Sequence, residues 1–111
     1  LGGLITTGMA VSAEALVSRT SQLPRVSFDP PKSIIGTNTV ECIKSGLMYG
    51  SASMIDGLID RIQAEMGEKC TVIATGGLAG QVVPLCRNPV ILDDDLLLKG
   101  LMLIYQKNTE K

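Results

Sequence analysis

The residues best suited to chemistry lie at the end of a β-branched run, in segment 71–77 (TVIATGG). Val72 and Ile73 favour a strand buried on both faces. Gly76 and Gly77 carry no side chain, so a phosphate or a sugar could approach their backbone closely. The next residues can open a helix, whose first N–H groups carry partial positive charge. This segment is therefore a candidate nucleotide site, although a tight turn would use the same residues.

A second candidate is the sequence Gly36-Thr37-Asn38-Thr39, which precedes the longest periodic apolar stretch. Hydroxyl and amide side chains at a helix N-terminus offer several donors that converge on one point, which suits an alcohol, an amide or a carboxylate. The same residues also form a good N-cap, with Glu41 as a first-turn acid. The sequence leaves both interpretations open, a ligand site or capping alone.

Two acidic features, the run 93–95 and Glu14, do not predict a catalytic or metal site. The run 93–95 (DDD) precedes a helix without the alternating spacing of a calcium loop, so helix capping is the favoured interpretation. Glu14 is expected to be solvated or salt-bridged rather than to act as a catalytic base. The chain contains no His, which removes Ser-His-Asp and Cys-His catalysis from it.

The composition predicts one globular domain with an aliphatic core of ordinary size, because 45% of the 111 residues are hydrophobic and only 3% aromatic. Ten basic and eleven acidic residues nearly cancel, so no nucleic acid or anionic membrane is expected as a partner. The three cysteines form no C-x-x-C pair and are expected to be reduced, mostly buried thiols of a cytoplasmic protein.

Two further observations concern the chain as a whole. No apolar run reaches the ~20 residues that span a bilayer, and no secretory signal is recognisable. The sequence starts with Leu1 in what resembles a strand, so we expect a piece of a longer protein.

Periodicity and turn residues predict alternating strands and helices. Strands are expected at 1–5, 25–28, 70–75 and 89–92, and helices at 9–22, from a cap at 37–39 to about 66, at 78–85 and at 96–107. Pro24 should end the first helix. This order indicates α/β layering, with helices covering a sheet.

The longest predicted helix carries two different stripes. The apolar stripe consists of Val40, Ile43, Leu47, Met54, Ile55, Leu58, Ile62 and Met66. The adjoining stripe consists of Gly46, Gly50, Ser53 and Gly57, although each interior glycine costs roughly 1 kcal/mol relative to Ala. Close packing against another backbone would offset that cost. Either a helix crossing inside the domain or a subunit interface would supply it.

Taken together, six blocks closely resemble the carboxyl-terminal half of type III pantothenate kinases, and the resemblance covers residues 1–111. The blocks are 2–8 (GGLITTG), 12–16 (SAEAL), 23–25 (LPR), 31–39 (PKSIIGTNT), 73–78 (IATGGL) and 100–105 (GLMLIY). The resemblance implies an α/β fold, namely one half of an actin-like, ribonuclease H-like ATPase domain with a mixed sheet covered by helices. This is the superfamily of acetate and sugar kinases, heat-shock-cognate proteins and actin.

The resemblance also implies a function. The family phosphorylates pantothenate with ATP in the first step of coenzyme A synthesis, needs a divalent cation such as Mg²⁺ and a monovalent cation such as K⁺ or NH₄⁺, and works as a cytoplasmic homodimer. By position, Thr39 resembles the substrate-contacting threonine near the subunit interface. Gly76 and Gly77 resemble the adenosine-side glycines.

The departures from the family pattern also carry expectations. The phosphate loop, the general-base aspartate, the monovalent-cation aspartate and the Asp-x-Gly-Thr segment of the family would lie upstream of residue 1, so no catalytic residue and no metal ligand is assigned here. Thr7 stands where the family usually has Pro. Because the catalytic groups named above would lie outside this chain, we expect the chain alone to transfer no phosphate. Thr39 and the diglycine are expected to face one cleft completed by a second lobe.

Two alternatives remain open. Members of the family are sometimes labelled Baf-family putative transcriptional activators, which would make this chain a regulatory module of the same fold. The other alternative is a dimerisation scaffold that binds neither ATP nor pantothenate.

Overall fold

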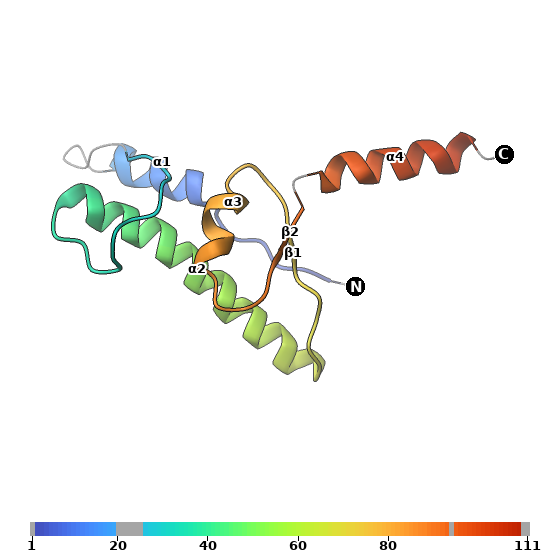
Figure 1. Ribbon diagram of the computed structural model, residues 1–111, viewed down its shortest axis with the longest axis horizontal. Coiled ribbons are helices and arrows are strands. Elements are labelled where there is room, and N and C mark those ends of the chain that lie inside the picture. Colours follow the sequence, from blue (N-terminus) through green and yellow to red (C-terminus); the bar gives the residue numbers. More distant parts are fainter. Residues whose placement is uncertain (1, 20–25, 94, 110–111) are drawn as a thin grey trace.

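The computed structural model describes residues 2–19, 26–93 and 95–109. In chain order the elements are α1 (Met9–Arg19), α2 (Thr39–Met66), β1 (Ile73–Ala74), α3 (Ala79–Val82), the 3-10 helix η1 (Val83–Leu85), β2 (Ile91–Leu92) and α4 (Leu96–Thr109). α1 and α3 pack along α2, the two strands lie side by side, and α4 stands apart from the rest (Figure 1). The predicted helix end at Pro24 lies outside the described residues.

The long helix α2 begins and ends where its sequence predicts. The side chain of Asn38 caps it by accepting a hydrogen bond from the backbone N–H of Glu41 at 2.9 Å. At the other end Gly67 adopts a left-handed φ of 74°, and its N–H donates to the Gln63 carbonyl at 2.9 Å. These two caps define a helix of 28 residues that borders both candidate sites.

The buried core lies where α1, α2 and α3 meet. Its buried members are Met9, Leu47, Met48, Ala52 and Val82. On the predicted apolar stripe of α2 only Leu47 is buried, whereas Val40, Met54, Ile62 and Met66 are exposed. The predicted stripe is therefore wrong at these four exposed residues, whereas Ile43 and Ile55 are partly buried and pack against the core. The side of α2 that α1 and α3 cover also includes Met48 and Ala52, which the predicted stripe did not contain.

The glycine stripe of α2 has no close neighbour among the described residues. A Cβ built at Gly46, Gly50 or Gly57 would meet no atom within 4 Å, and Ser53 is exposed. A helix crossing inside the described part of the chain therefore does not explain these small residues. The subunit interface stays a prediction.

The two strands form a parallel pair, with Ile73 opposite Ile91 and Ala74 opposite Leu92. The pairing lies inside the predicted ranges 70–75 and 89–92, but each strand has only two residues. Hydrogen bonds from the Ile91 N–H to the Val72 carbonyl and from the Asp93 N–H to the Ala74 carbonyl complete the ladder at 2.8 and 2.9 Å.

Several strand predictions are wrong. Residues 2–5 and 26–28 form no strand, so the described residues contain a parallel pair and not a mixed sheet. Ile73 is 51% exposed, so its strand is not buried on both faces. The physical reason is that a strand extends only along a hydrogen-bonded neighbour, and here each strand has one neighbour.

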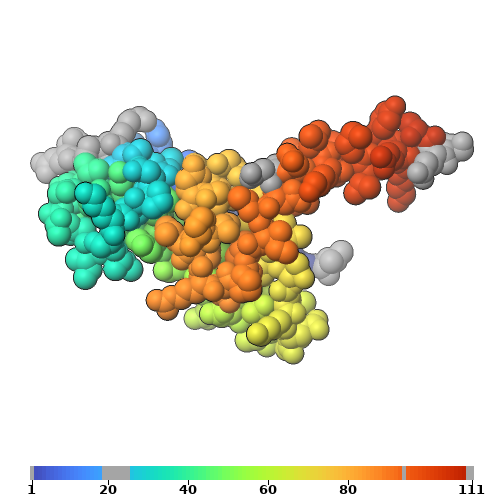
Figure 2. All heavy atoms as spheres, in the orientation of Figure 1, coloured from blue at the N-terminus to red at the C-terminus, as the bar shows by residue number. Residues whose placement is uncertain are grey.

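The last helix, α4, extends away from the other elements (Figure 2). It fulfils the prediction of a helix from residue 96 and continues to Thr109. Its exposed apolar residues are Leu96, Leu97, Leu98, Leu101, Met102, Leu103, Ile104 and Tyr105. The radius of gyration is 17.3 Å, compared with about 13 Å for a compact chain of this length. A helix that is apolar on all sides is typical of one enclosed by other elements.

Candidate functional site

Gly76 and Gly77 form the turn between β1 and α3. Gly76 has a φ of 117°, a region that favours glycine, and its carbonyl accepts a hydrogen bond from the N–H of Ala79 at 3.3 Å. A Cβ at either glycine would meet no atom within 4 Å. The diglycine therefore presents its backbone to open space, as a ligand contact requires.

The α-helix that follows the diglycine is shorter than the sequence predicts. α3 makes a single turn, and residues 83–85 continue as a 3-10 helix that contains Pro84. Proline cannot donate to the α-helical ladder, which explains the change. Since a helix dipole sums over aligned peptides, so short a helix attracts an anion less than the predicted eight-residue helix would.

A cavity of about 500 Å³ opens beside the diglycine. Its other walls are the segment 6–11 at the start of α1 and residues Ser51, Met54 and Ile55 of α2. The Thr6 hydroxyl donates to the Met54 sulfur at 3.7 Å, which links this segment to α2. The structure thus joins the 6–8 turn to the diglycine, an association that the sequence did not indicate.

Thr39 is the first residue of α2 and is exposed at a different cavity, of about 560 Å³. The lining residues are Leu16, Gly36, Thr37, Asn38, Thr39, Cys42, Ile43, Gly46 and Leu47. The Asn38 oxygen is used by the helix cap, but the hydroxyls of Thr37 and Thr39 have no hydrogen-bond partner among the described residues. Capping therefore accounts for Asn38 and leaves two hydroxyls for a ligand.

Cys42 is a residue of this cavity that the sequence did not single out. Its thiol is free and exposed, whereas Cys70 and Cys86 are half-buried. The expectation of mostly buried cysteines is thus wrong for Cys42, because it lies on the uncovered side of α2. Burial, and secondly the charge of Asp56, raise the pKa of the Cys86 thiol.

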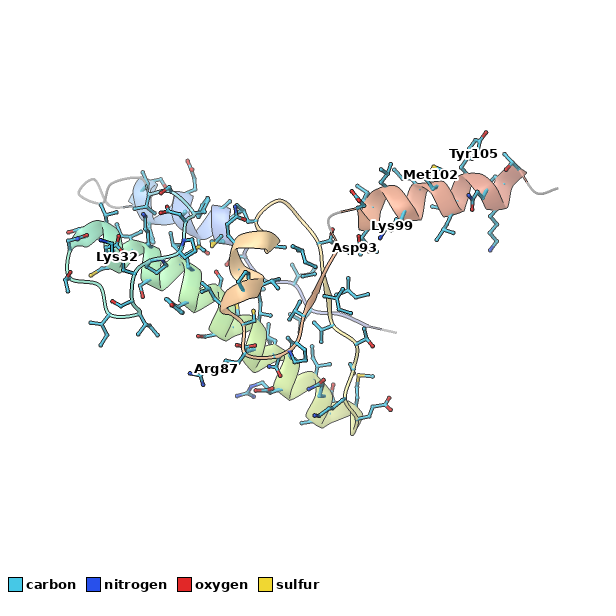
Figure 3. The ribbon with its side chains drawn as sticks, viewed as in Figure 1. Lys32, Arg87, Asp93, Lys99, Met102 and Tyr105 are labelled. Atoms are coloured by element: carbon cyan, nitrogen blue, oxygen red, sulfur yellow. The ribbon has the colours of Figure 1, made fainter. Side chains whose placement is uncertain are left out.

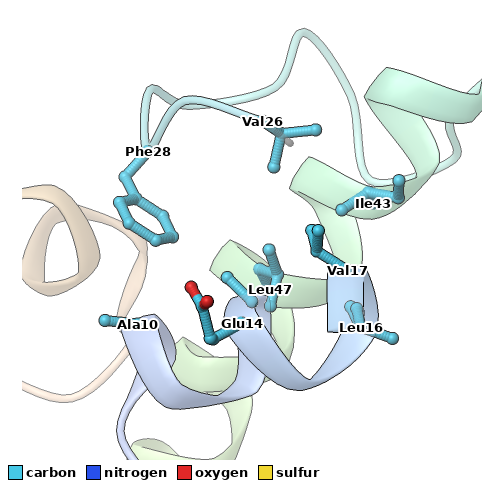
Figure 4. Close-up of a pocket in the computed structure, with 9 residues that line it drawn as sticks. Ala10, Glu14, Leu16, Val17, Val26, Phe28, Ile43 and Leu47 are labelled. Atoms are coloured by element: carbon cyan, nitrogen blue, oxygen red, sulfur yellow. The ribbon is translucent and has the colours of Figure 1, made fainter. Parts of the chain in front are cut away.

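A third, apolar cavity of about 210 Å³ lies between α1, α2 and the segment 26–28 (Figure 4). It shares Leu16, Ile43 and Leu47 with the Thr39 cavity. Glu14 is the charged residue among those that line it, and Figure 4 shows the Glu14 carboxylate directed into the space below Phe28. Glu14 is exposed at this cavity, so the expectation that it is solvated or salt-bridged is not contradicted.

The two predicted contact sites line separate cavities. No residue belongs both to the Thr39 cavity and to the cavity of Gly76 and Gly77. The described residues therefore do not form one cleft from them, and a cleft completed by a second lobe stays a prediction.

The acidic run before α4 contributes to the start of that helix. The Asp93 side chain accepts the N–H of Asp95 at 3.1 Å and pairs with Lys99 at 3.0 Å (Figure 3). Asp94 lies outside the described residues. Within the parts of the chain that are described, no three His, Cys, Asp or Glu side chains gather to hold a metal ion.

A polar contact with α2 fixes the loop after η1. The Asp56 carboxylate on α2 accepts the backbone N–H groups of Arg87 and Asn88 at 2.8 and 3.0 Å. Partial burial acts to raise the pKa of Asp56, but these hydrogen bonds outweigh it, so the pKa lies below the ordinary value. Figure 3 shows Arg87 beside α2 at this loop.

None of the described helices combines the length and the apolar content that crossing a membrane would require.

The profile of the type III pantothenate kinase family matches residues 1–61. Over 109 residues the chain is 47% identical to a type III pantothenate kinase of Syntrophus aciditrophicus, and the match covers 98% of this chain and 43% of that protein. It is 46% identical over 105 residues to one of Thermus thermophilus, which covers 95% of this chain and 41% of the relative. The chain thus spans less than half the length of these curated relatives.

A parallel strand pair that ends in a diglycine turn, beside a long capped helix, defines part of an α/β domain. The chain belongs to the type III pantothenate kinase family, since the family profile matches more than half of it.

Proposed function

We propose that the complete protein is an ATP-dependent kinase that phosphorylates the terminal hydroxyl of pantothenate, the first step of coenzyme A synthesis. The observation that carries this proposal is the match of nearly the whole chain to type III pantothenate kinases. In this proposal the chain is the carboxyl-terminal half of an actin-like, ribonuclease H-like domain. The protein would work in the cytoplasm.

Thr39 is proposed to contact pantothenate. Pantothenate carries two hydroxyls, an amide and a carboxylate, all of which pair with hydroxyl groups. The cavity at Thr39 offers the hydroxyls of Thr37 and Thr39, which have no partner among the described residues, beside apolar Leu16 and Ile43. This combination of a few polar groups on an apolar wall is typical of small-molecule sites.

Gly76 and Gly77 are proposed to contact the adenosine side of ATP. Their bare backbone and the open space beside them fit a group that must approach closely. A divalent cation such as Mg²⁺ and a monovalent cation such as K⁺ would be held mainly by residues outside this chain, because the described residues offer no suitable cluster. The general base would also lie outside it. We therefore propose that residues 1–111 alone transfer no phosphate.

The protein is further proposed to be a homodimer with α2 at the interface. Small exposed residues follow one side of α2 along most of its length: Thr39, Gly46, Gly50, Ser53, Gly57 and Ala64. Such a side lets another backbone approach closely, which would offset the unfavourable helix propensity of three glycines. Thr39 lies on this side, so a partner subunit would come close to the proposed substrate site.

The experiment that tests the substrate role compares Thr39→Ala with Thr39→Ser in the complete enzyme. Removing a hydroxyl that bonds pantothenate should raise the KM for pantothenate about tenfold, since the loss of such a bond is about 1.4 kcal/mol. Thr39→Ser keeps the hydroxyl and should stay within about threefold of wild type. An unchanged KM and kcat in Thr39→Ala would remove the proposed role.

A further inference from the structure

We propose that Ser45 is a positioning residue for the substrate site, because its buried hydroxyl holds the segment 29–38 against α2. This inference rests on the proposed function and adds to it a residue that contacts no substrate. The segment 29–38 runs alongside the first turns of α2, and its last three residues, 36–38, are part of the wall of the Thr39 cavity. Whatever fixes this segment therefore fixes the wall.

The central contact is made by Ser45. Its side chain is only 6% exposed, and its hydroxyl donates a hydrogen bond to the backbone carbonyl of Ile34. A buried hydroxyl left without a partner is unfavourable, and so is an unpaired carbonyl. The bond therefore favours one distance between α2 and Ile34, two residues before the cavity wall begins.

Gly36 supplies a second, independent sign that the segment must lie close to α2. A Cβ built at Gly36 would lie 2.5 Å from the Cys42 nitrogen and 2.8 Å from its Cα. These are backbone atoms of the first helical turn, which cannot move aside as the end of a flexible side chain can. Only glycine fits this approach, so the segment contacts the backbone of α2 directly.

The outer contacts of the segment are weaker. Lys44 pairs with Asp29 at 3.1 Å, and the Lys32 N–H donates to the Glu41 carboxylate at 3.4 Å. Figure 3 shows Lys32 near the start of α2. Asp29 is largely exposed, and exposed pairs contribute little. The Ser45 bond and the Gly36 contact thus hold the part of the segment that shapes the cavity.

The consequence of these contacts is that the wall of the Thr39 cavity is formed before the substrate binds. With the segment held, Thr37 and Asn38 stay beside Thr39, and pantothenate meets a formed cavity. Without the Ser45 bond the wall would have to be ordered by the substrate itself, which weakens binding. The groups that perform phosphate transfer lie elsewhere, so the loss should appear in KM for pantothenate and not in kcat.

The test uses the complete enzyme with Ser45→Ala, Gly36→Ala and a matched control, Ser33→Ala. Ser33 also donates its hydroxyl to a carbonyl, that of Ile35 at 2.8 Å, but it is exposed and the bond stays within the segment. Ser45→Ala and Gly36→Ala should each raise the KM for pantothenate about fivefold or more, with kcat and the KM for ATP within about twofold. Ser33→Ala should change none of these values.

A double-mutant cycle separates positioning from a general loss of stability. In a Thr37→Ala background, Ser45→Ala should raise the KM for pantothenate by less than about twofold, because Thr37 carries the hydroxyl that the held segment positions in the cavity. Equal effects in both backgrounds, or unchanged KM in both Ser45→Ala and Gly36→Ala, would overturn the inference. If Thr39→Ala itself has no effect, the proposed substrate role fails and the inference with it; if only the Ser45 and Gly36 variants have none, the inference fails alone.

Discussion

Asp56 and Asn88 are joined by three hydrogen bonds across 32 residues of sequence. The Asn88 backbone N–H donates to the Asp56 carboxylate at 3.0 Å, and the Asn88 side-chain amide donates to the same oxygen at 3.2 Å and to the Asp56 carbonyl at 3.4 Å. The loop that leads into β2 is thereby attached to α2. Because β2 is the partner of β1, this contact also supports the strand that carries the diglycine.

Asp56→Asn should lower the free energy of unfolding of the complete protein by about 1–2 kcal/mol at pH 7, because a charged acceptor is replaced by a neutral amide. The native hydrogen bonds lower the pKa of Asp56 below its ordinary 3.8. A carboxyl whose pKa is lower in the folded state stabilises the fold above its unfolded pKa, and this contribution is lost as the pH falls through the folded pKa.

The free energies of unfolding in urea of the wild type and Asp56→Asn should therefore differ by the same amount at about pH 7 and pH 5. This difference should disappear below about pH 4. Asp60→Asn is the control, since Asp60 is exposed and, within the described parts of the chain, accepts a single side-chain hydrogen bond, from the Asn88 amide at 3.2 Å. If the difference in free energy of unfolding between the wild type and Asp56→Asn widens in acid, the ionised Asp56 carboxylate does not stabilise the fold in the way described.

Cys42 should report on occupation of the Thr39 cavity. It is exposed there, whereas Cys86 is half-buried and its pKa is raised by burial. We expect iodoacetamide to label Cys42 at least about fivefold faster than Cys86 at pH 7.5, because the thiolate is the reactive form. Pantothenate should slow the labelling of Cys42, which peptide mass spectrometry measures.

Labelled enzyme should show a raised KM for pantothenate, whereas Cys42→Ser should be insensitive to the reagent. Labelling of Cys42 at a rate that saturating pantothenate does not change would place the substrate elsewhere.

The sequence predicts the parts of this fold that depend on local chemistry. Asn38 caps α2 within the expected range 37–39, and the helix ends at Met66, near the expected residue, because helix ends depend on residues within one turn. The buried side of α2 is not predictable in this way, because it depends on where α1 and α3 pack. The strands are shorter than predicted for the same reason, since strand length depends on neighbouring strands that are distant in sequence.

In the candidate site, too, some residues can be predicted from the local sequence and others cannot. Thr39, Gly76 and Gly77 stand out through residue type and order, and their exposure to cavities agrees with ligand contact. Ser45 could not be identified beforehand, because a serine within a helix has no special role until the Ile34 carbonyl lies beside it. Cys42 similarly becomes significant only through the cavity that it lines.

The two glycines of the diglycine turn should respond differently to alanine. Gly76→Ala should lower the free energy of unfolding by about 1–3 kcal/mol, because its φ of 117° is strained for any residue with a Cβ. Gly77 has no positive φ and has open space around it, so Gly77→Ala should change stability by less than about 1 kcal/mol. Both variants should raise the KM for ATP, since each adds a methyl group to the proposed contact surface. A stable Gly77→Ala enzyme with unchanged KM for ATP would argue against the nucleotide role of Gly77.

Gly50 lies near the middle of the small-residue side of α2, where a Cβ would meet no atom of the described chain. If this side forms the dimer interface, the larger side chain of Gly50→Leu should push the α2 helices of the two subunits apart. The dimer dissociation constant should then rise at least tenfold, an effect of about 1.4 kcal/mol. Sedimentation velocity over a range of concentrations measures this change. Glu65→Leu is the matched control, because Glu65 is exposed and lies roughly a quarter turn from that side. A Gly50→Leu protein that remains as dimeric as Glu65→Leu would show that α2 faces something other than a second subunit.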